Sequence, residues 1–468
     1  MSVGSHLAER VGLGDLTEAY PPDLVDAVVA KAGVREARVR LLPTRLMVYF
    51  VLGRALFSPD PYREVLRELA DAARGADGWD GWRVPDKAAI FRARRRLGAE
   101  PVRELLAQVG PVATEATPGA FWRGWRLMVV DGTTVEAADT PANDAEFGRP
   151  RNQRGKPVAY PMARVTVLAE SGTHVVVDAA AGPYTCGEVT LAEALLRSLR
   201  PGMLLLADRG FPGVALWKKA AATGADLLWR VQSKWALAPE EVLADGSWLS
   251  TVRIRVVKGR PEKGRESIRV RVIEYRLQDP GRDAARHYRL VTTILDPRKA
   301  PARELAALYA ERWEAETTLA EWKTAQIGSD HVLASKVPEL VYQEIYAHLA
   351  VHAAVRAQMH RVATTLPDPL DPDRLSFTAA LRAARRSVTR PTRSFPPDGT
   401  ATGTSRIDQE LREELNPVRR LRTVIRQVKR MLPKYPAWDP SRPRPPQPTK
   451  RPDQAVELVP AHQPTADP

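Results

Sequence analysis

The sequence predicts an α/β protein in which helices flank a mixed β-sheet, with a helical region before the sheet and a β-rich insert within it. Three observations support this prediction. Apolar residues recur at helical spacing through residues 1–118. Strand and helix patterns follow one another from residue 119 onward. Strict alternation at 252–256 and 268–276 then indicates an antiparallel insert at about 233–297.

The N-terminal region contains several short helices. Apolar spacing predicts them at 21–33, 41–57 and 61–75. Asp86 is suited to cap a further helix that ends at Gly98, and another helix starts near Pro101. The capped helix carries four arginines, Arg92, Arg94, Arg95 and Arg96. Two short helices about a glycine turn form either a helix-turn-helix unit that contacts DNA or a helical hairpin with a solvated basic face.

The middle of the chain changes to strands. The apolar run at 125–139 predicts a strand that ends in an Asp131–Gly132 turn, followed by a second strand. Beyond it the pattern predicts a hairpin at 162–184, a helix at 188–200, a strand at 202–211 that runs into Asp208, a helix at 213–224 and a strand at 225–231. These elements form the mixed sheet and its flanking helices.

The last third returns to helices. Continuous helices are predicted at 301–324 and 337–363, and a ragged helical C-terminal region spans 366–435. Residues 436–468 are rich in proline, which predicts a disordered tail. The central α/β domain therefore extends over 119–365.

Composition narrows the choice of partner. Lys and Arg number 70 against 56 Asp and Glu, giving a net charge of +14, which favours a polyanionic partner such as nucleic acid. The most apolar stretch, at 41–57, is interrupted by Pro43, Arg45 and Arg54, so no membrane association is expected. One cysteine, Cys186, excludes an internal disulfide, and the N-terminus lacks a secretory pattern. A cytoplasmic protein is expected.

The stretch "YAERWEAETTLAEWK" at 309–323 carries four functional side chains. On an ideal α-helix of about 100° per residue, Tyr309, Arg312, Glu316 and Lys323 fall within an arc of about 60°. The stripe is either a solvated ion-paired face or a metal ligand beside a clamp for DNA phosphates. Trp313 is suited to stack on an unpaired base, although a core position is the alternative.

Three carboxylates form the candidate catalytic set. Asp131 in "VVDGT" and Asp208 in "LLADRG" follow apolar strands, and Glu316 lies on a helix able to pack on the same sheet. Two aspartates and a glutamate are hard oxygen ligands suited to two Mg²⁺ or Mn²⁺ ions. Two such ions support phosphoryl transfer. Without a third carboxylate, the Asp131–Gly132 pair and the Asp208 segment would each be interpreted as an ordinary turn.

These motifs resemble those of the bacterial insertion-sequence-4 family of DDE transposases. Tyr309, Arg312, Glu316 and Lys323 match that family's signature, and "VVDGT" and "LLADRGF" match its two aspartate motifs. The resemblance implies a ribonuclease-H-like catalytic domain with a β-rich insert between the second aspartate and the glutamate. It also implies that Asp131, Asp208 and Glu316 bind the metals, while Tyr309, Arg312 and Lys323 contact the element ends.

The function implied is cut-and-paste DNA transposition by two-metal-ion hydrolysis at the element ends and strand transfer by the 3′-hydroxyl. The partners implied are the terminal inverted repeats and target DNA, bound by a homodimer in a synaptic complex of a nucleoid-associated bacterial protein. Arg92, Arg95 and Arg96 are candidate DNA contacts of the helical region. A transposase-derived DNA-binding protein without cleavage and a ribonuclease-H-like nuclease are the alternatives.

Other charged residues are weaker candidates. His348 and His352 are one turn apart, but Leu349 replaces the glutamate that a zinc-protease motif requires. Glu188 and Glu321 are close to the candidate motifs in sequence and are interpreted as surface residues or supporting partners rather than metal ligands.

Overall fold

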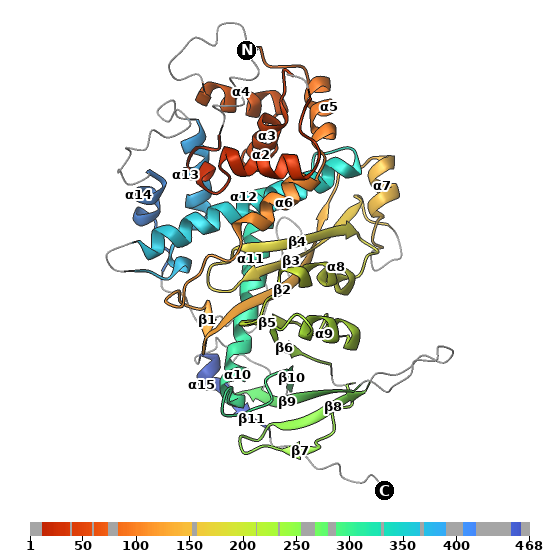
Figure 1. The fold of residues 1–468 in the computed structure, drawn as a ribbon, viewed down its shortest axis with the longest axis vertical. Coiled ribbons are helices and arrows are strands. Elements are labelled where there is room, and N and C mark those ends of the chain that lie inside the picture. Colours follow the sequence, from red (N-terminus) through yellow and green to blue (C-terminus); the bar gives the residue numbers. More distant parts are fainter. Residues whose placement is uncertain are drawn as a thin grey trace, which may run out of the picture. The chain divides into compact units, whose positions relative to one another are not determined.

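The computed structural model describes residues 12–37, 40–58, 60–73, 83–151, 157–211, 213–232, 235–253, 267–278, 287–328, 332–365, 369–389, 406–417 and 451–459. They group into two compact units, residues 1–199 with 313–416 and residues 200–312 with 417–468. Figure 1 labels the elements of both. In the described stretches, no helix combines the length and apolar character needed to cross a membrane.

The first unit begins with the predicted helical region. After the short helix η1 (Gly14–Glu18), its helices are α2 (Pro22–Lys31), α3 (Thr44–Leu56), α4 (Tyr62–Ala73), α5 (Lys87–Leu97) and α6 (Glu100–Val109). Asp86 caps α5 by accepting a 2.6 Å hydrogen bond from the Ala89 amide, and Gly98 ends it with φ +70°. These two predictions are confirmed, because both signals are local to the helix ends.

Helix α12 (Pro338–Thr364) is the centre of this unit. It packs against α3 and α6 on one side and against the sheet strand β4 (Val176–Pro183) on the other (Figure 1). Most of its side chains are buried, including Ile345, Leu349 and Met359. A helix that is apolar on most of its circumference requires such cover from several elements. The N-terminal helices and the sheet therefore share one hydrophobic core.

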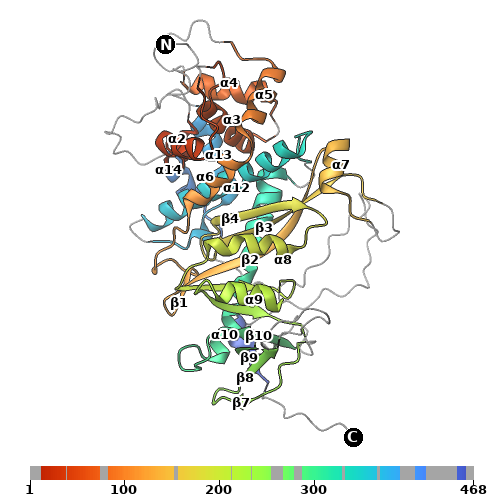
Figure 2. The same ribbon diagram turned by 45° about the vertical axis from the view of Figure 1, so that its right-hand side comes forward.

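The sheet of the first unit is antiparallel, in the order β4-β3-β2. Strand β2 (Trp125–Glu136) pairs along its length with β3 (Met162–Glu170), and the short β1 (Phe121–Trp122) extends β2. The hairpin predicted at 162–184 is confirmed, with Gly172 at φ +77° and His174 at φ +61° in its turn. Helix α8 (Glu188–Leu195) packs on β3 and β4 (Figure 2).

Strand β2 differs from the prediction at the first aspartate. The turn expected at Asp131–Gly132 is wrong, because β2 continues through both residues without a break. Asp131 is opposite Val167 and Gly132 is opposite Thr166 in an uninterrupted register. Pairing with β3 overrides the turn tendency of the Asp-Gly pair. Asp131 therefore lies in the middle of a strand.

The predicted helix at 301–324 also differs. It consists of α10 (Ala302–Leu308), a 3₁₀ turn η3 (Tyr309–Arg312), α11 (Trp313–Ala320) and a π-helical segment η4 (Glu321–Gly328). Because 3₁₀ and π turns advance by different angles from an α-helix, the single arc calculated from the sequence does not apply. The division between the two units falls between Arg312 and Trp313.

The other elements of the first unit lie between β2 and β3 or after β4 in the sequence. They are α7 (Pro141–Phe147), the short helices η2 (Leu196–Ser198) and η5 (Pro372–Arg374), α13 (Phe377–Val388) and α14 (Arg406–Glu413). The helical C-terminal region predicted at 366–435 is thus partly described, since residues 390–405 and 418–450 lie outside the described stretches.

The second unit has its own run of strands. The parallel pair β5 (Met203–Ala207) and β6 (Asp226–Arg230) continues into antiparallel strands in the order β5-β6-β10-β9-β8-β7. Helix α9 (Val214–Ala221) connects the parallel pair. The insert supplies β7 (Glu241–Val242), β8 (Trp248–Arg253), β9 (Ser267–Leu277) and β10 (Tyr288–Thr292).

One part of the predicted disordered tail is ordered. Residues Pro452–Ala455 form α15, and Val456–Leu458 form β11, which pairs antiparallel with β9. Along the chain, three antiparallel strands, a helix, a strand, a helix and a strand follow one another, and the helix with Glu316 comes after the insert. This element order confirms the predicted mixed α/β class with flanking helices and is consistent with a ribonuclease-H-like fold.

Candidate active site on strand β2 and helix α11

Asp131 lies half-buried on β2, and its carboxylate is held by its own strand. Oδ1 accepts a 2.8 Å hydrogen bond from the amide of Gly132. Because side chains alternate along a strand, Asp131 and Thr133 share one face of β2, and Gly132 belongs to the other. The position of Asp131 in the middle of a paired strand fixes the direction of its carboxylate more firmly than a turn would.

The opposite face of β2 explains why residue 132 is glycine. A Cβ at Gly132 would come within 2.9 Å of Cδ of Glu188, which begins α8. Glu188 in turn binds Arg164 through a 2.7 Å ion pair. Glu188 therefore lies on the face of β2 away from Asp131. This agrees with its interpretation as a supporting residue rather than a metal ligand.

Glu316 lies half-buried on α11, and α11 packs against β2. Two of the three predicted carboxylates thus come from packed elements of one unit. They are 185 residues apart in sequence (316 − 131). Carboxylate oxygens from a strand and from the helix that covers it are a suitable donor set for a divalent cation such as Mg²⁺ or Mn²⁺.

Lys323 contacts β2 close to Asp131. Its Nζ donates a 3.2 Å hydrogen bond to Oγ1 of Thr133, two residues beyond Asp131 on the same face. Burial lowers the pKa of Lys323, and the Glu136 carboxylate opposes this shift. Thr133 was not predicted as a functional residue, because a threonine in a strand carries no distinguishing sequence signal.

Asp208 directly follows β5 in the second unit, as predicted. Its Oδ1 accepts a 2.5 Å hydrogen bond from the Arg209 amide, and its carbonyl accepts one of 3.1 Å from Phe211. The turn after β5 thus holds the carboxylate at the strand end. Convergence of Asp208 with Asp131 and Glu316 stays a prediction.

Tyr309 and Arg312 are buried in the second unit, with 6% of each residue exposed. The Tyr309 hydroxyl donates a 3.3 Å hydrogen bond to the carbonyl of Ala207, the residue before Asp208. Their burial does not favour the direct DNA contacts expected from the sequence. Trp313 is 43% exposed, which is compatible with stacking on a base, whereas Trp322 is fully buried.

The arginines of α5 divide into buried and exposed positions. Arg94 is buried and donates hydrogen bonds to Gln343, Tyr62 and Ser335. Arg95 forms an ion pair with Glu339, and Arg96 donates to the Leu42 carbonyl at 2.7 Å. Arg92 is exposed. Of the three predicted DNA contacts on this helix, Arg92 and Arg95 are exposed, and Arg95 is the one held in an ion pair.

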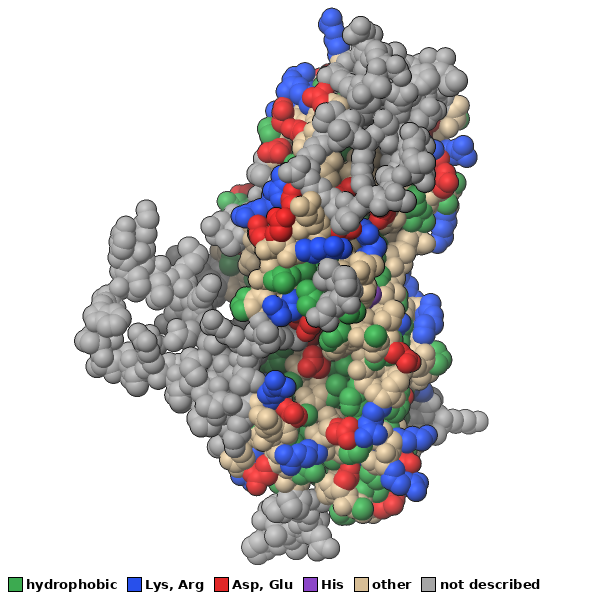
Figure 3. All heavy atoms as spheres, turned by 90° about the vertical axis from the view of Figure 1, so that its left-hand side faces the viewer, with side chains coloured by type: hydrophobic (Ala, Val, Ile, Leu, Met, Phe, Trp, Pro, Cys, Tyr) green, Lys and Arg blue, Asp and Glu red, His purple; other side chains and the backbone are tan. Residues whose placement is uncertain are grey.

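The surface charge is mixed. On the face drawn in Figure 3, Lys and Arg side chains of the described residues are scattered and alternate with Asp and Glu. The net positive charge of the chain is therefore not concentrated in one patch on the described part of this face. DNA affinity therefore depends on specific side chains that contact the DNA as well as on net charge.

Known transposases resemble this chain in sequence. Residues 10–107 match the family model described as insertion element 4 transposase N-terminal, and residues 122–352 match the transposase DDE domain. The chain is 29% identical over 438 residues to the transposase InsG for insertion sequence element IS4 of Escherichia coli (strain K12), covering 91% of this chain and 94% of that protein. It is 25% identical over 234 residues to the putative transposase InsZ of the same organism, covering 50% of this chain and 75% of that protein.

A solved structure is also similar. It is a cryo-EM structure of the piggyBac transposase synaptic complex with hairpin DNA. The sequence identity is 13% and the TM-score 0.42, with 86% of this chain and 85% of that chain covered.

Proposed function

This chain belongs to the insertion-sequence-4 family of DDE transposases, and from this premise we propose that it moves its element by a cut-and-paste route that uses two divalent metal ions. Enzymes of this family cleave DNA and transfer strands in a metal-dependent reaction. The observation that supports the proposed site is the packing of α11, which carries Glu316, against β2, which carries Asp131.

Asp131, Asp208 and Glu316 are the proposed metal ligands. Asp131 and Glu316 are supported by their positions on packed elements, and Asp208 by its place at the end of β5. Mg²⁺ or Mn²⁺ suits a site built from three carboxylates. Bound divalent ions would supply the Lewis acidity for attack by a water or a 3′-hydroxyl and would stabilise the leaving oxygen.

Lys323 is the proposed contact to a phosphate of the cleaved strand. Its ammonium lies beside Thr133 on the face of β2 that bears Asp131, so a phosphate held there would be next to the carboxylates. Trp313, exposed on the adjacent helix α11, is proposed to stack on an unpaired base. Arg92 is proposed to contact DNA from the helical N-terminal region.

Tyr309 receives a different role from the one expected from the sequence. Its hydroxyl is engaged with the Ala207 carbonyl, so we assign it to holding the strand end that carries Asp208. The terminal inverted repeats and target DNA are the proposed substrates. A homodimer that joins two ends is the proposed assembly, because a paired cut requires two active sites.

The function is tested by incubating the full-length protein with duplexes that carry the DNA flanking its own gene, with and without Mg²⁺. Nicks are mapped at nucleotide resolution, and joining is measured with a target plasmid. We expect Mg²⁺-dependent nicks at the element ends, lost in Asp131→Asn and Glu316→Gln. Glu188→Gln is the matched control, because that carboxylate lies beside β2 on its other face, and we expect it to nick normally.

Each outcome separates the proposal from its alternatives. Bound ends without Mg²⁺-dependent nicks would favour a DNA-binding protein that does not cleave. Nicks without joining to the target would favour a nuclease. If Glu316→Gln nicks as fast as the parent protein, the assigned metal site is incorrect.

A further inference from the structure

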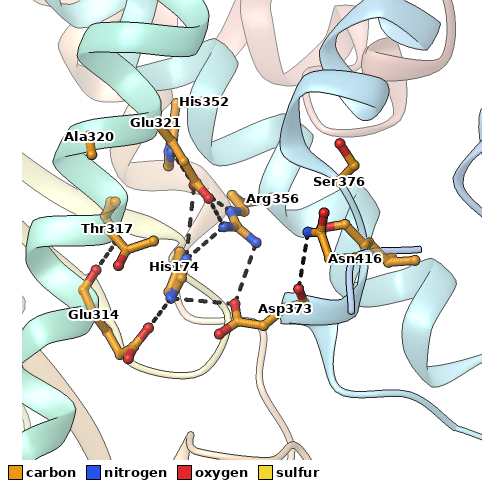
Figure 4. A network of polar contacts seen from close by, with 12 residues as sticks. His174, Glu314, Thr317, Ala320, Glu321, His352, Arg356, Asp373, Ser376 and Asn416 are labelled. Carbon is orange, nitrogen blue, oxygen red and sulfur yellow. Dashed lines mark hydrogen bonds and ion pairs between the residues drawn. The ribbon is translucent and has the colours of Figure 1, made fainter. Parts of the chain in front are cut away.

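A buried cluster of polar residues lies behind α11 in the first unit. It consists of His174, Glu314, Glu321, Arg356 and Asp373, and is named here the His174 cluster (Figure 4). These residues come from the β3–β4 turn, α11, the start of η4, α12 and η5. His174 is 1% exposed, and Glu314 and Arg356 are each 2% exposed. Buried charges at this depth require defined partners.

The distances within the cluster show which nitrogen of His174 carries the ring proton. Nη2 of Arg356 lies 2.6 Å from Nδ1 of His174 and also donates to Glu321. An arginine nitrogen is only a donor, so Nδ1 of His174 is the acceptor and the ring proton is on Nε2. That proton is donated to Oε2 of Glu314, 2.5 Å away. His174 thus connects Arg356 to Glu314.

A metal ion at this cluster is disfavoured by the same distances. His174, Glu314 and Asp373 each offer a ligand atom within 4.8 Å of the others, a donor set of the type that binds transition metals. A metal on Nε2 would move the ring proton to Nδ1, where it would face the Arg356 donor at 2.6 Å. Metal-bound histidines instead donate from the second nitrogen to an acceptor. The cluster is therefore a hydrogen-bonded one.

Glu321 is held as a carboxylate. Burial raises its pKa, but the Arg356 guanidinium beside it acts in the opposite direction, and the pKa lies well below its usual range. Arg356 approaches it in a bidentate manner, with Nε donating to Oε2 at 2.9 Å and Nη2 to Oε1. Such forked pairs fix orientation as well as charge. The start of η4 is consequently fixed to α12.

Two of the three acidic members of the cluster are close in sequence to the two proposed functional residues. Glu314 precedes Glu316 by two positions, and Glu321 precedes Lys323 by two positions. On a helix a separation of two residues is a rotation of about 200°, so Glu314 and Glu316 point to opposite sides of α11. The cluster therefore binds α11 and the start of η4 on the side that points away from β2.

We infer that His174 and Arg356 are positioning residues of the transposase active site. By holding Glu314 and Glu321 they fix the rotation of α11 and of the start of η4, and so direct Glu316 and Lys323 toward β2. The π-helical turn that begins at Glu321 is stabilised by the same contacts. This inference rests on the proposed metal role of Glu316.

The test uses variants of the full-length protein with element-end DNA. His174→Asn removes the ring but keeps a residue type that accepts the φ of +61° at this position. Glu314→Gln keeps the size of the side chain and removes its charge. Both are expected to lower single-turnover nicking by about 10–100-fold and to raise the Mg²⁺ concentration for half-maximal rate, as loss of groups that orient metal ligands does. End binding is expected to stay within about twofold, because neither side chain is exposed to DNA.

Gln358→Leu is the matched control. Gln358 lies two residues beyond Arg356 on α12, is buried, and donates a 2.8 Å hydrogen bond to Asp408, away from α11. We expect Gln358→Leu to lose about as much thermal stability as His174→Asn and Glu314→Gln, but to keep the Mg²⁺ dependence of the parent protein.

Two outcomes would overturn the inference and leave the proposed function intact. The first is that His174→Asn and Glu314→Gln nick at the parent rate with the parent Mg²⁺ dependence while Glu316→Gln is inactive. Losses that follow thermal stability in all three variants, with no change in Mg²⁺ dependence, would also overturn it. An active Glu316→Gln would instead reject the proposed function.

Discussion

The Lys323 ammonium donates a 3.2 Å hydrogen bond to the Thr133 hydroxyl, which joins the C-terminal end of the signature segment to the strand of Asp131. The contact spans 190 residues of sequence and places a cation two residues from a proposed metal ligand. It also shows that the π-helical segment after α11 still directs Lys323 toward β2. A phosphate bound at this point would lie near both this cation and the proposed metal ligand Asp131.

The first prediction concerns the charge of Lys323. Because burial lowers its pKa, the side chain loses its proton at a lower pH than an exposed lysine. We expect DNA engagement at the cut site to weaken as pH rises toward the ordinary lysine range, and Lys323→Arg to remove this dependence, since arginine stays protonated. Single-turnover nicking at a series of pH values measures it, with Lys323→Ala as the uncharged reference. If nicking by Lys323→Arg declines with rising pH as steeply as nicking by the parent protein, Lys323 is not the group whose charge binds the phosphate.

The same shift affects stability. In the unfolded chain Lys323 has an ordinary pKa, so the folded state disfavours its protonated form. This cost is fully present at pH values below the folded pKa and disappears as pH rises toward the unfolded pKa. Lys323→Met is therefore expected to stabilise the fold near neutral pH by a small amount, while it weakens DNA engagement. Thermal unfolding at pH 7 measures the first effect and a salt-dependent binding assay the second.

The second prediction concerns Asp208. Asp208→Asn keeps the shape of the side chain but removes the charge that a hard cation needs. We expect nicking in Mg²⁺ to fall by more than about 100-fold, a larger effect than the loss of an orienting group. End binding is expected to remain. Simultaneous loss of binding and nicking would indicate misfolding or another role for Asp208, and circular dichroism of the variant separates these two causes.

The third prediction concerns Tyr309. Tyr309→Phe removes the hydrogen bond to the Ala207 carbonyl but keeps the buried ring. We expect the free energy of unfolding to fall by about 0.5–1.5 kcal/mol, the net value of a neutral hydrogen bond. The salt dependence of DNA binding is expected to be unchanged, because the hydroxyl faces the protein. Denaturant unfolding and a binding titration at several salt concentrations check both parts. If Tyr309→Phe lowers the slope of log affinity against log salt, Tyr309 contacts DNA directly, as the sequence predicted.

The fourth prediction compares two arginines of α5. Arg92 is exposed, whereas Arg94 is buried among hydrogen-bond acceptors. Arg92→Ala is expected to reduce the slope of log affinity against log salt by about one, with little effect on stability. Arg94→Ala is expected to destabilise the fold by about 3 kcal/mol, since several hydrogen bonds to a buried charge are lost. Equal salt slopes for Arg92→Ala and the parent would exclude Arg92 from the DNA interface.

The sequence by itself determined features that depend on near neighbours in the chain. The capping carboxylate of Asp86 and the left-handed Gly98 act on the helix ends next to them, so both were predictable. Element order and the β-rich insert followed from apolar periodicity. The motifs also marked Asp131, Asp208 and Glu316 as candidate ligands and predicted that Asp208 follows an apolar strand, as it does.

Only the tertiary structure decided the features that depend on contacts between distant segments. Pairing with β3 keeps Asp131 within a strand, although the Asp-Gly pair favours a turn. Arg94 is buried against α12, where it donates to Gln343, and Tyr309 is buried with its hydroxyl on the Ala207 carbonyl, although the sequence predicted a DNA contact for Tyr309. His174 and Glu314 meet across 140 residues of chain. Local sequence carries no signal for such contacts, because their free energy comes from burial and pairing with partners that folding alone brings together.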